Sequence, residues 1–324
     1  MEAAARARTN IALVKYWGKR DERLVLPFTG SLSMTLDALW TDTRVEFCGR
    51  PGEDELSIDG EKAGGEELSR VTALLDLVRA DNPALGAARV ESRATVPKAA
   101  GLASSASAFA ALAAAASWAA GLDPTPRELS ILARRGSGSA CRSVFGGFVE
   151  WTRGERDDGA DSHAGTLVEP AAWEVAMCLC LVNAGQKGIS SRSAMKASVG
   201  TSPFFAEWAR TTARDLEEAK EALDARALER LGAVTERSFL KMHAVAMTSD
   251  PPALFWKPAT LSLLDAVHSL RRRALSAWAT VDAGPHVAVL CRRVDAPRVR
   301  EALAPIPGVR AIIVAGPGRG VERL

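Results

Sequence analysis

Residues 97–107 form the first group of side chains that could bind phosphate. Pro97 and Gly101 lie in a run of small residues and serines that leads into an alanine-rich stretch. Glycine lets a ligand approach the backbone closely, and the free amides at a helix start carry partial positive charge. We therefore predict a phosphate cradle, although no Gly-Lys-Ser/Thr follows as in a Walker A loop. A plain helix N-cap at Ser104 or Ser105 explains these residues about equally well.

Residues 135–143 form a second polar cluster. Ser137 and Ser139 flank a glycine, and Arg142 lies three residues beyond the second serine. Hydroxyls, backbone amides and a planar guanidinium can together bind a carboxylate or a phosphate. The alternative is a flexible surface turn, but the apolar residues that follow at once indicate a buried setting.

A lysine and an aspartate stand out against apolar surroundings. Lys15 lies in residues 10–17, which we expect to form a strand, and an unpaired buried lysine is costly, so it is either paired or functional. The alternative is an edge strand with Lys15 in solvent. Asp282 ends an expected strand and could accept a proton from a substrate hydroxyl. Its local sequence, Asp-Ala-Gly-Pro, favours a plain turn.

The elements that must position these residues indicate an α+β protein. Apolar periodicity predicts strands at 10–17, 31–36, 43–47, 88–95 and 145–151, and helices at 64–80, after 105 and at 126–135. In the second half it predicts strands at 175–182, 278–282, 287–291 and 309–314, helices through most of 190–275, and a short helix at 297–303. We place a lobe boundary near residue 184, which gives lobes of residues 1–183 and 184–324.

Composition narrows the class of protein. The 324 residues suffice for two lobes or one large domain, and 47% hydrophobic with 25% charged residues is typical of a soluble globular protein. The formal net charge of +2 disfavours a nucleic-acid binder, so a local cluster of cations must hold any anion. The five scattered cysteines lack a CxxC pair and indicate reduced thiols in a cytoplasmic protein. We expect neither a signal peptide nor a membrane segment.

Taken together, these segments resemble the diphosphomevalonate decarboxylases of the galactokinase–homoserine kinase–mevalonate kinase–phosphomevalonate kinase (GHMP) superfamily. Several separate segments match in the family's order, which is far more specific than any one of them. The matching segments are 10–21, 26–27 with 31–36, 100–106, 136–142 with 145–147, 242–244 and 282–285.

The resemblance implies a two-lobed fold, with a ribosomal-protein-S5-like N-terminal lobe and a ferredoxin-like C-terminal lobe. It implies that ATP phosphorylates the 3-hydroxyl of mevalonate 5-diphosphate, with Mg²⁺ bridging the ATP phosphates, and that phosphate and carbon dioxide then leave to give isopentenyl diphosphate. It further implies a homodimer.

The resemblance also assigns roles to residues. Asp282 would orient or deprotonate the hydroxyl, Lys15 would keep Asp282 ionised, and Arg142 would bind the substrate carboxylate. The residues implied for the substrate diphosphate are Tyr16, Lys19, Ser137, Ser139, Ser190, Ser191 and Arg192. Those implied for the ATP phosphates are Pro97, Ala100, Gly101, Leu102, Ala103, Ser104, Ser105 and Ser107. Either Ser190 or Ser191 could supply the diphosphate hydroxyl, and Arg192 either contacts substrate or packs outside it.

Three other functions compete with this one. A decarboxylase of mevalonate 5-phosphate and a 3-kinase that does not decarboxylate are sister activities. Lys15, Arg142 and Asp282 together favour decarboxylation over the kinase alone. A non-catalytic regulator of the same fold is a remote alternative, because it would have no need of this set.

Overall fold

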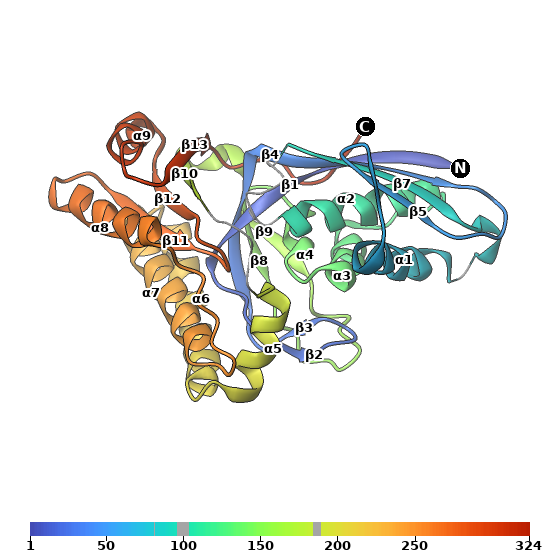
Figure 1. Ribbon diagram of the computed structural model, residues 1–324, viewed down its shortest axis with the longest axis horizontal. Coiled ribbons are helices and arrows are strands. Elements are labelled where there is room, and N and C mark those ends of the chain that lie inside the picture. The colour runs from blue at the N-terminus through green and yellow to red at the C-terminus, as the bar shows by residue number, and fades with distance from the viewer. Residues whose placement is uncertain (81, 96–103, 184–188) are drawn as a thin grey trace.

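The computed structural model describes residues 1–80, 82–95, 104–183 and 189–324. Its described residues form two large sheets, each covered by helices, and one two-stranded sheet, in an α+β arrangement of two lobes (Figure 1). Among these residues no helix is both long and apolar enough to cross a membrane.

The sheet of the N-terminal lobe is built around two long strands, β1 (Glu2–Val14) and β4 (Ser31–Phe47), which pair antiparallel. Its order is β14-β1-β4-β7-β5-β6, and β8 and β9 extend it from the Ser31 end of β4. The other strands are β5 (Glu55–Ile58), β6 (Glu61–Ala63), β7 (Ala88–Ala94), β8 (Phe148–Trp151), β9 (Ala164–Val168) and β14 (Glu322–Arg323). A small ladder of β2 (Lys19–Asp21) and β3 (Leu26–Pro27) lies apart from it.

Helices α1 (Gly65–Arg79), α2 (Ser104–Ala119), α3 (Pro126–Gly136) and α4 (Ala140–Ser143) cover one face of this sheet (Figure 1). Helix α2 is the innermost, and its alanines from Ala113 to Ala116 are completely buried. Because alanine adds almost no side-chain bulk, the helix backbone can lie close to β1 and β4. This packing sets the position of the helix start, where the phosphate cradle is predicted.

The C-terminal lobe contains an antiparallel sheet of order β11-β12-β10-β13. Its strands are β10 (Val175–Val182), β11 (Ala277–Val281), β12 (Val287–Arg292) and β13 (Val309–Ala315). Its helices are α5 (Ser191–Thr201), α6 (Phe205–Asp224), α7 (Leu228–Met247), α8 (Pro258–Arg272) and α9 (Ala296–Leu303), and short 3₁₀ turns lie at Pro83–Leu85, Pro170–Ala172 and Arg293–Asp295. Helix α7 packs against both β11 and β1, so it touches the two lobes at once.

The predicted lobe boundary at residue 184 falls on the first of residues 184–188, which lie outside the described residues. Strand β10 precedes that boundary, yet it hydrogen-bonds with β12 and β13 in the C-terminal sheet. Strand β14 returns to pair with β1. The boundary therefore stays a prediction, and the pairing of β10 leads us to propose a division ahead of Val175.

Most predicted elements are present, but several differ, and strands β5, β6, β9 and β14 were not predicted. Residues 31–36 and 43–47 are parts of the single strand β4, and β1 begins at Glu2 instead of Asn10. Strand β1 also ends at Val14, so Lys15 lies just beyond the strand and not within it. Arg142 belongs to the short helix α4 and not to a loop.

Candidate active site

Lys15 and Asp282 meet at the junction of the two lobes. Lys15 follows β1, and Asp282 follows β11 of the other sheet, 267 residues later in the chain. The Lys15 ammonium donates a hydrogen bond to Asp282 Oδ1 and a second, of 2.9 Å, to the carbonyl of Ala12. The alternative of a solvent-facing Lys15 is wrong, because its side chain is only 1% exposed, whereas that of Asp282 is 40% exposed.

The environment of Lys15 is unfavourable to its charge. Burial lowers the pKa of Lys15, the Asp282 carboxylate opposes that shift, and the nearby Arg142 lowers the pKa further. Thr280, on β11, donates to the same Ala12 carbonyl at 3.2 Å and so fastens β11 to β1 beside the pair. The pair therefore forms only where the two lobes pack correctly.

Arg142 is the second buried cation, with an exposed fraction of 2%. Its Nε and Nη2 each donate to Asn10 Oδ1 at 3.2 Å, Nε donates to Ser33 Oγ at 3.0 Å, and Nη1 donates to Ser31 Oγ at 2.5 Å. Within the described chain no carboxylate pairs with it, and burial lowers its pKa. A buried guanidinium held only by neutral groups has charge left to bind an anion.

Tyr16 lies beside this cation against the ring of Trp151, with the ring centroids 4.7 Å apart. Its hydroxyl is buried, makes no hydrogen bond with any described residue and has its pKa raised, mainly by burial. A Cβ at Gly138 would lie 2.8 Å from that hydroxyl, so the residue-137–139 turn approaches it closely. Nearby, Lys19 is paired with Glu22 and is 10% exposed.

Two of the serines predicted to bind the diphosphate, Ser137 and Ser139, lie between α3 and α4. Ser137 caps the end of α3, and its hydroxyl lies 3.3 Å from that of Ser105 on α2. Ser139 precedes α4, and its carbonyl accepts a 3.1 Å hydrogen bond from Asn10. The structure thus brings the serines of residues 137–139 to both the Arg142 network and the start of α2.

The start of α5 carries the remaining three of these residues. Ser190 is its N-cap and accepts a 3.0 Å hydrogen bond from the Ser193 amide, while Ser191 is the first helical residue. Arg192 forms a 3.1 Å ion pair with Glu66 on α1, so α5 reaches across to the N-terminal lobe. Helix α5 also packs against β2, the strand that carries Lys19. The hydroxyl of Ser190 is occupied in capping, which leaves Ser191 the freer of the two serines.

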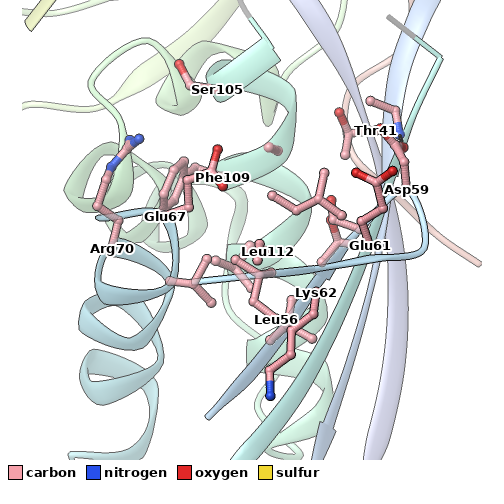
Figure 2. A pocket seen from close by; sticks show the side chains of 18 of the residues that line it. Thr41, Leu56, Asp59, Glu61, Lys62, Glu67, Arg70, Ser105, Phe109 and Leu112 are labelled. Atoms are coloured by element: carbon pink, nitrogen blue, oxygen red, sulfur yellow. Dashed lines mark hydrogen bonds between the residues drawn. The ribbon is translucent and has the colours of Figure 1, made fainter. Parts of the chain in front are cut away.

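A cavity of about 710 Å³ opens beside the start of α2 (Figure 2). Its walls come from α1, α2 and the β5–β7 part of the sheet, and Ser105 lies at its rim. Arg70 stacks on Phe109, 4.4 Å from the ring centroid, and donates to the carbonyl of Gly136 at 3.0 Å. Burial lowers the pKa of Arg70 to about 10. The cavity combines an apolar floor with a cation near the predicted cradle.

The predicted cradle is only partly within the described residues. Pro97, Ala100, Gly101, Leu102 and Ala103 lie outside them. Ser104 is the first residue of α2, which agrees with a helix start at this point. Ser107 is buried and shares a 2.8 Å hydrogen bond with Thr41 inside the lobe. Its contact with ATP stays a prediction.

Several residues of the site were not assigned a role from sequence. Asn10, Ser31 and Ser33 hold Arg142, and the only sequence signal was their polarity on strands whose other residues are apolar. The sequence did not indicate a role for Arg70, because arginines are common on the polar face of an amphipathic helix. The described residues include no group of three or more His, Cys, Asp or Glu side chains arranged to hold a metal ion.

Comparison with known proteins identifies both halves of the chain. Residues 7–164 match the diphosphomevalonate decarboxylase-like N-terminal domain, and residues 177–310 match the mevalonate 5-diphosphate decarboxylase C-terminal domain. The diphosphomevalonate decarboxylase of Gibberella zeae is 36% identical over 91% of this chain and 82% of its own length. That of Bos taurus is 35% identical over 87% of this chain and 75% of its own length.

Solved structures agree over the whole chain. The mevalonate diphosphate decarboxylase from Enterococcus faecalis has a TM-score of 0.93 and 39% identity, covering 100% of this chain and 99% of that one. A complex described as MDDEF with MVAPP, AMPPCP and magnesium has a TM-score of 0.94 and 40% identity, with coverage of 100% and 99%. The fold is therefore the two-lobed α+β fold of the GHMP kinases. Within that class, the chain belongs to the diphosphomevalonate decarboxylase family.

Proposed function

We propose that the protein catalyses the ATP-dependent decarboxylation of mevalonate 5-diphosphate. The products are isopentenyl diphosphate, carbon dioxide, ADP and phosphate, which places the reaction in the mevalonate pathway of isoprenoid synthesis. One observation carries the proposal beyond family membership: the Lys15–Asp282 pair joins the lobes beside a buried Arg142 that has no carboxylate partner among the described residues. This arrangement offers a proton acceptor and an anion site side by side.

In the first step, Asp282 accepts the proton of the 3-hydroxyl while the hydroxyl oxygen attacks the γ-phosphorus of ATP. The bond from the γ-phosphorus to the β–γ bridging oxygen breaks, and ADP leaves with that oxygen. Lys15 favours the ionised carboxylate, as a cation within hydrogen-bond distance does. The 40% exposure of Asp282 leaves its second oxygen open to a substrate.

In the second step, the new 3-phosphate leaves from a tertiary carbon. The bond from the carboxylate carbon to C2 breaks, its electron pair forms the C2–C3 double bond, and carbon dioxide departs. Arg142 holds the carboxylate until then, through a guanidinium that Asn10, Ser31 and Ser33 fix in one orientation. Fixed donors of this kind act mainly by positioning and charge stabilisation.

The substrate diphosphate is proposed to lie between the residue-137–139 turn and α5. Tyr16 supplies a buried hydroxyl without a described partner, and Ser191 and Arg192 lie at the positively polarised start of α5. Lys19 forms an ion pair with Glu22, and this pair must break before the Lys19 ammonium can bind a phosphate oxygen. A diphosphate has enough oxygens to use all of these donors, which favours it over a monophosphate.

ATP is proposed to bind in the cavity beside α2, with its phosphates between Ser105 and Arg70. The cavity presents isolated oxygen donors such as Glu67 and Ser105, and no described carboxylate cluster. This donor set fits a Mg²⁺ ion that is held mostly by the ATP phosphates. When bound, that ion neutralises phosphate charge.

We further propose a cytoplasmic homodimer that binds neither nucleic acid nor membranes. The free state of all five cysteines supports a reducing compartment, and the net charge of +2 gives no general attraction to nucleic acid. Chromatography coupled to light scattering measures the oligomeric state directly.

The decisive test is turnover of pure protein with ATP and, separately, mevalonate, mevalonate 5-phosphate and mevalonate 5-diphosphate. We expect ADP and carbon dioxide in equal amounts from the diphosphate, and little from the others. ADP without carbon dioxide would refute the decarboxylase and indicate the 3-kinase. Preference for the monophosphate would indicate the sister decarboxylase.

A further inference from the structure

Helix α7 runs behind the Lys15–Asp282 pair and reaches the backbone next to both partners. Ser238 Oγ accepts a 2.9 Å hydrogen bond from the Lys15 amide. His243 Nε2 lies 3.2 Å from the carbonyl of Val281, the residue just before Asp282. Ser238 is 1% exposed and His243 is 0% exposed, so water cannot replace either contact.

His243 is held in a single tautomer by its surroundings. Its ring lies 4.9 Å from the centroid of Trp256 and 6.0 Å from that of Phe255, in a closely packed aromatic site. Burial, followed by the charge of Lys15, lowers the pKa of His243 to about 4, so the ring is neutral at physiological pH. Its one proton must lie on Nε2, because the Val281 carbonyl can only accept. Nδ1 is buried and has no partner among the described residues.

Asp282, like Lys15, lies just beyond the end of its strand. Strand β11 ends at Val281, and the chain turns at once through a 2.7 Å hydrogen bond from the Gly284 amide to the Asp282 carbonyl. In the described part of the chain, the β11–β12 ladder ends at Val281, one residue before Asp282. The His243 contact is made to the last peptide before that turn.

We propose that His243 and Ser238 are positioning residues, which fix the two backbone segments that carry Asp282 and Lys15. This inference rests on the proposed function for its effect on catalysis, but not for its effect on the backbone. A histidine that only filled space would need no donor at Nε2, and an apolar ring would serve equally well in this aromatic site. The hydrogen bond is therefore the feature to test, separately from the packing.

The kinetic test compares His243→Phe, which keeps a ring but removes the donor, with His243→Gln, whose amide nitrogen can donate from nearly the same place. His243→Phe should lower kcat about tenfold, with both KM values within about twofold, because binding groups are untouched. His243→Gln should recover most of that loss. Phe239→Leu is the matched control, because Phe239 packs on His243 at 6.2 Å and makes no side-chain hydrogen bond.

A second readout needs no substrate. In hydrogen–deuterium exchange of the ligand-free protein, residues 277–283 should exchange about tenfold faster in His243→Phe, and near the wild-type rate in His243→Gln. If the wild type does not turn over mevalonate 5-diphosphate, the proposed function fails while this measurement still decides the inference. Equal losses of kcat in Phe239→Leu and His243→Phe, or exchange in His243→Gln as fast as in His243→Phe, would overturn it.

Ser238→Ala gives the same test on the Lys15 side and still decides if His243→Phe does not fold. We expect kcat to fall about fivefold at unchanged KM, because one neutral hydrogen bond of a buried amide is lost. Unchanged kcat in that variant would remove Ser238 from the proposal.

Discussion

Replacing Asp282 with asparagine tests the cross-lobe pair most directly, because the change removes a charge and almost no volume. It leaves the Lys15 ammonium buried, at 1% exposure, without a counter-charge, and only neutral acceptors remain, namely the Ala12 carbonyl and the amide oxygen of the substituted side chain. Breaking a fully buried ion pair on one side costs about 3–5 kcal/mol of unfolding free energy. Because the carboxylate is 40% exposed and water screens it, we expect a smaller loss of about 2–3 kcal/mol.

The loss should depend on pH in a defined direction. Burial already lowers the pKa of Lys15 below the ordinary 10.5, and the Asp282 carboxylate opposes that shift. Without the carboxylate, the pKa of Lys15 falls further. The folded state then binds fewer protons than the unfolded state over a wider range of pH. Stability rises with pH wherever the unfolded state binds more protons. Asp282→Asn should therefore recover stability as pH rises from the lowered pKa towards 10.5.

The assay is urea unfolding at several pH values, together with kcat. The matched control is the double variant Lys15→Met with Asp282→Asn, which removes both charges and should lie within about 1 kcal/mol of wild type. Thr280 still donates to the Ala12 carbonyl in that variant. We expect Asp282→Asn to lower kcat roughly 10²–10⁴-fold with substrate binding largely kept. Unchanged turnover, or a stability loss that the double variant shares fully, would refute this account of the pair.

Three further predictions concern the neighbouring parts of the site. Arg142→Lys keeps the positive charge but loses the branched guanidinium that donates to three side chains, so kcat/KM should fall about a hundredfold or more. Near-wild-type kinetics would contradict the assignment of Arg142 to the substrate carboxylate. Arg70→Gln should raise KM for ATP about five- to tenfold without changing KM for mevalonate 5-diphosphate. A higher KM for mevalonate 5-diphosphate with an unchanged KM for ATP would contradict the assignment of Arg70 to ATP. Gly138→Ala places a Cβ 2.8 Å from the Tyr16 hydroxyl and should raise KM for mevalonate 5-diphosphate several-fold. The control is Gly200→Ala, whose Cβ would meet no neighbouring atom within 4 Å and should leave the kinetics unchanged. Equal kinetics in the two variants would argue against close packing of residue 138 on Tyr16.

Much of the fold followed from local periodicity. Helix α1 lies at Gly65–Arg79 where 64–80 was expected, and β10 matches its predicted bounds. Both have strong apolar patterns that neighbouring elements do not alter. The first half of β1 was missed, because its buried face is Ala3, Ala5 and Ala7, and alanine gives little strand signal.

The site was harder to predict, because its geometry depends on distant contacts. The local sequence of Asp282 favoured a plain turn, and only the family resemblance paired it with Lys15. Residues 242–244 entered the sequence analysis only as a segment that resembles the family, and the aromatic surroundings of His243 taken alone would indicate packing. No sequence pattern could reveal its hydrogen bond to Val281, since an α7 side chain meets β11 only after the lobes have packed.

The return of β14 to β1 has a consequence for synthesis of the chain on the ribosome. Arg8 donates a hydrogen bond to the carbonyl of Gly320, 312 residues further on, and Ala5 pairs with Arg323. At a synthesis rate of about 5–20 residues per second, roughly 15–60 s pass between synthesis of β1 and synthesis of β14, which pairs with its outer edge. An open strand edge can recruit another nascent chain, and arginines such as Arg6 and Arg8 discourage that pairing. We therefore expect the arginines of β1 to reduce aggregation of the nascent chain until β14 has been synthesised.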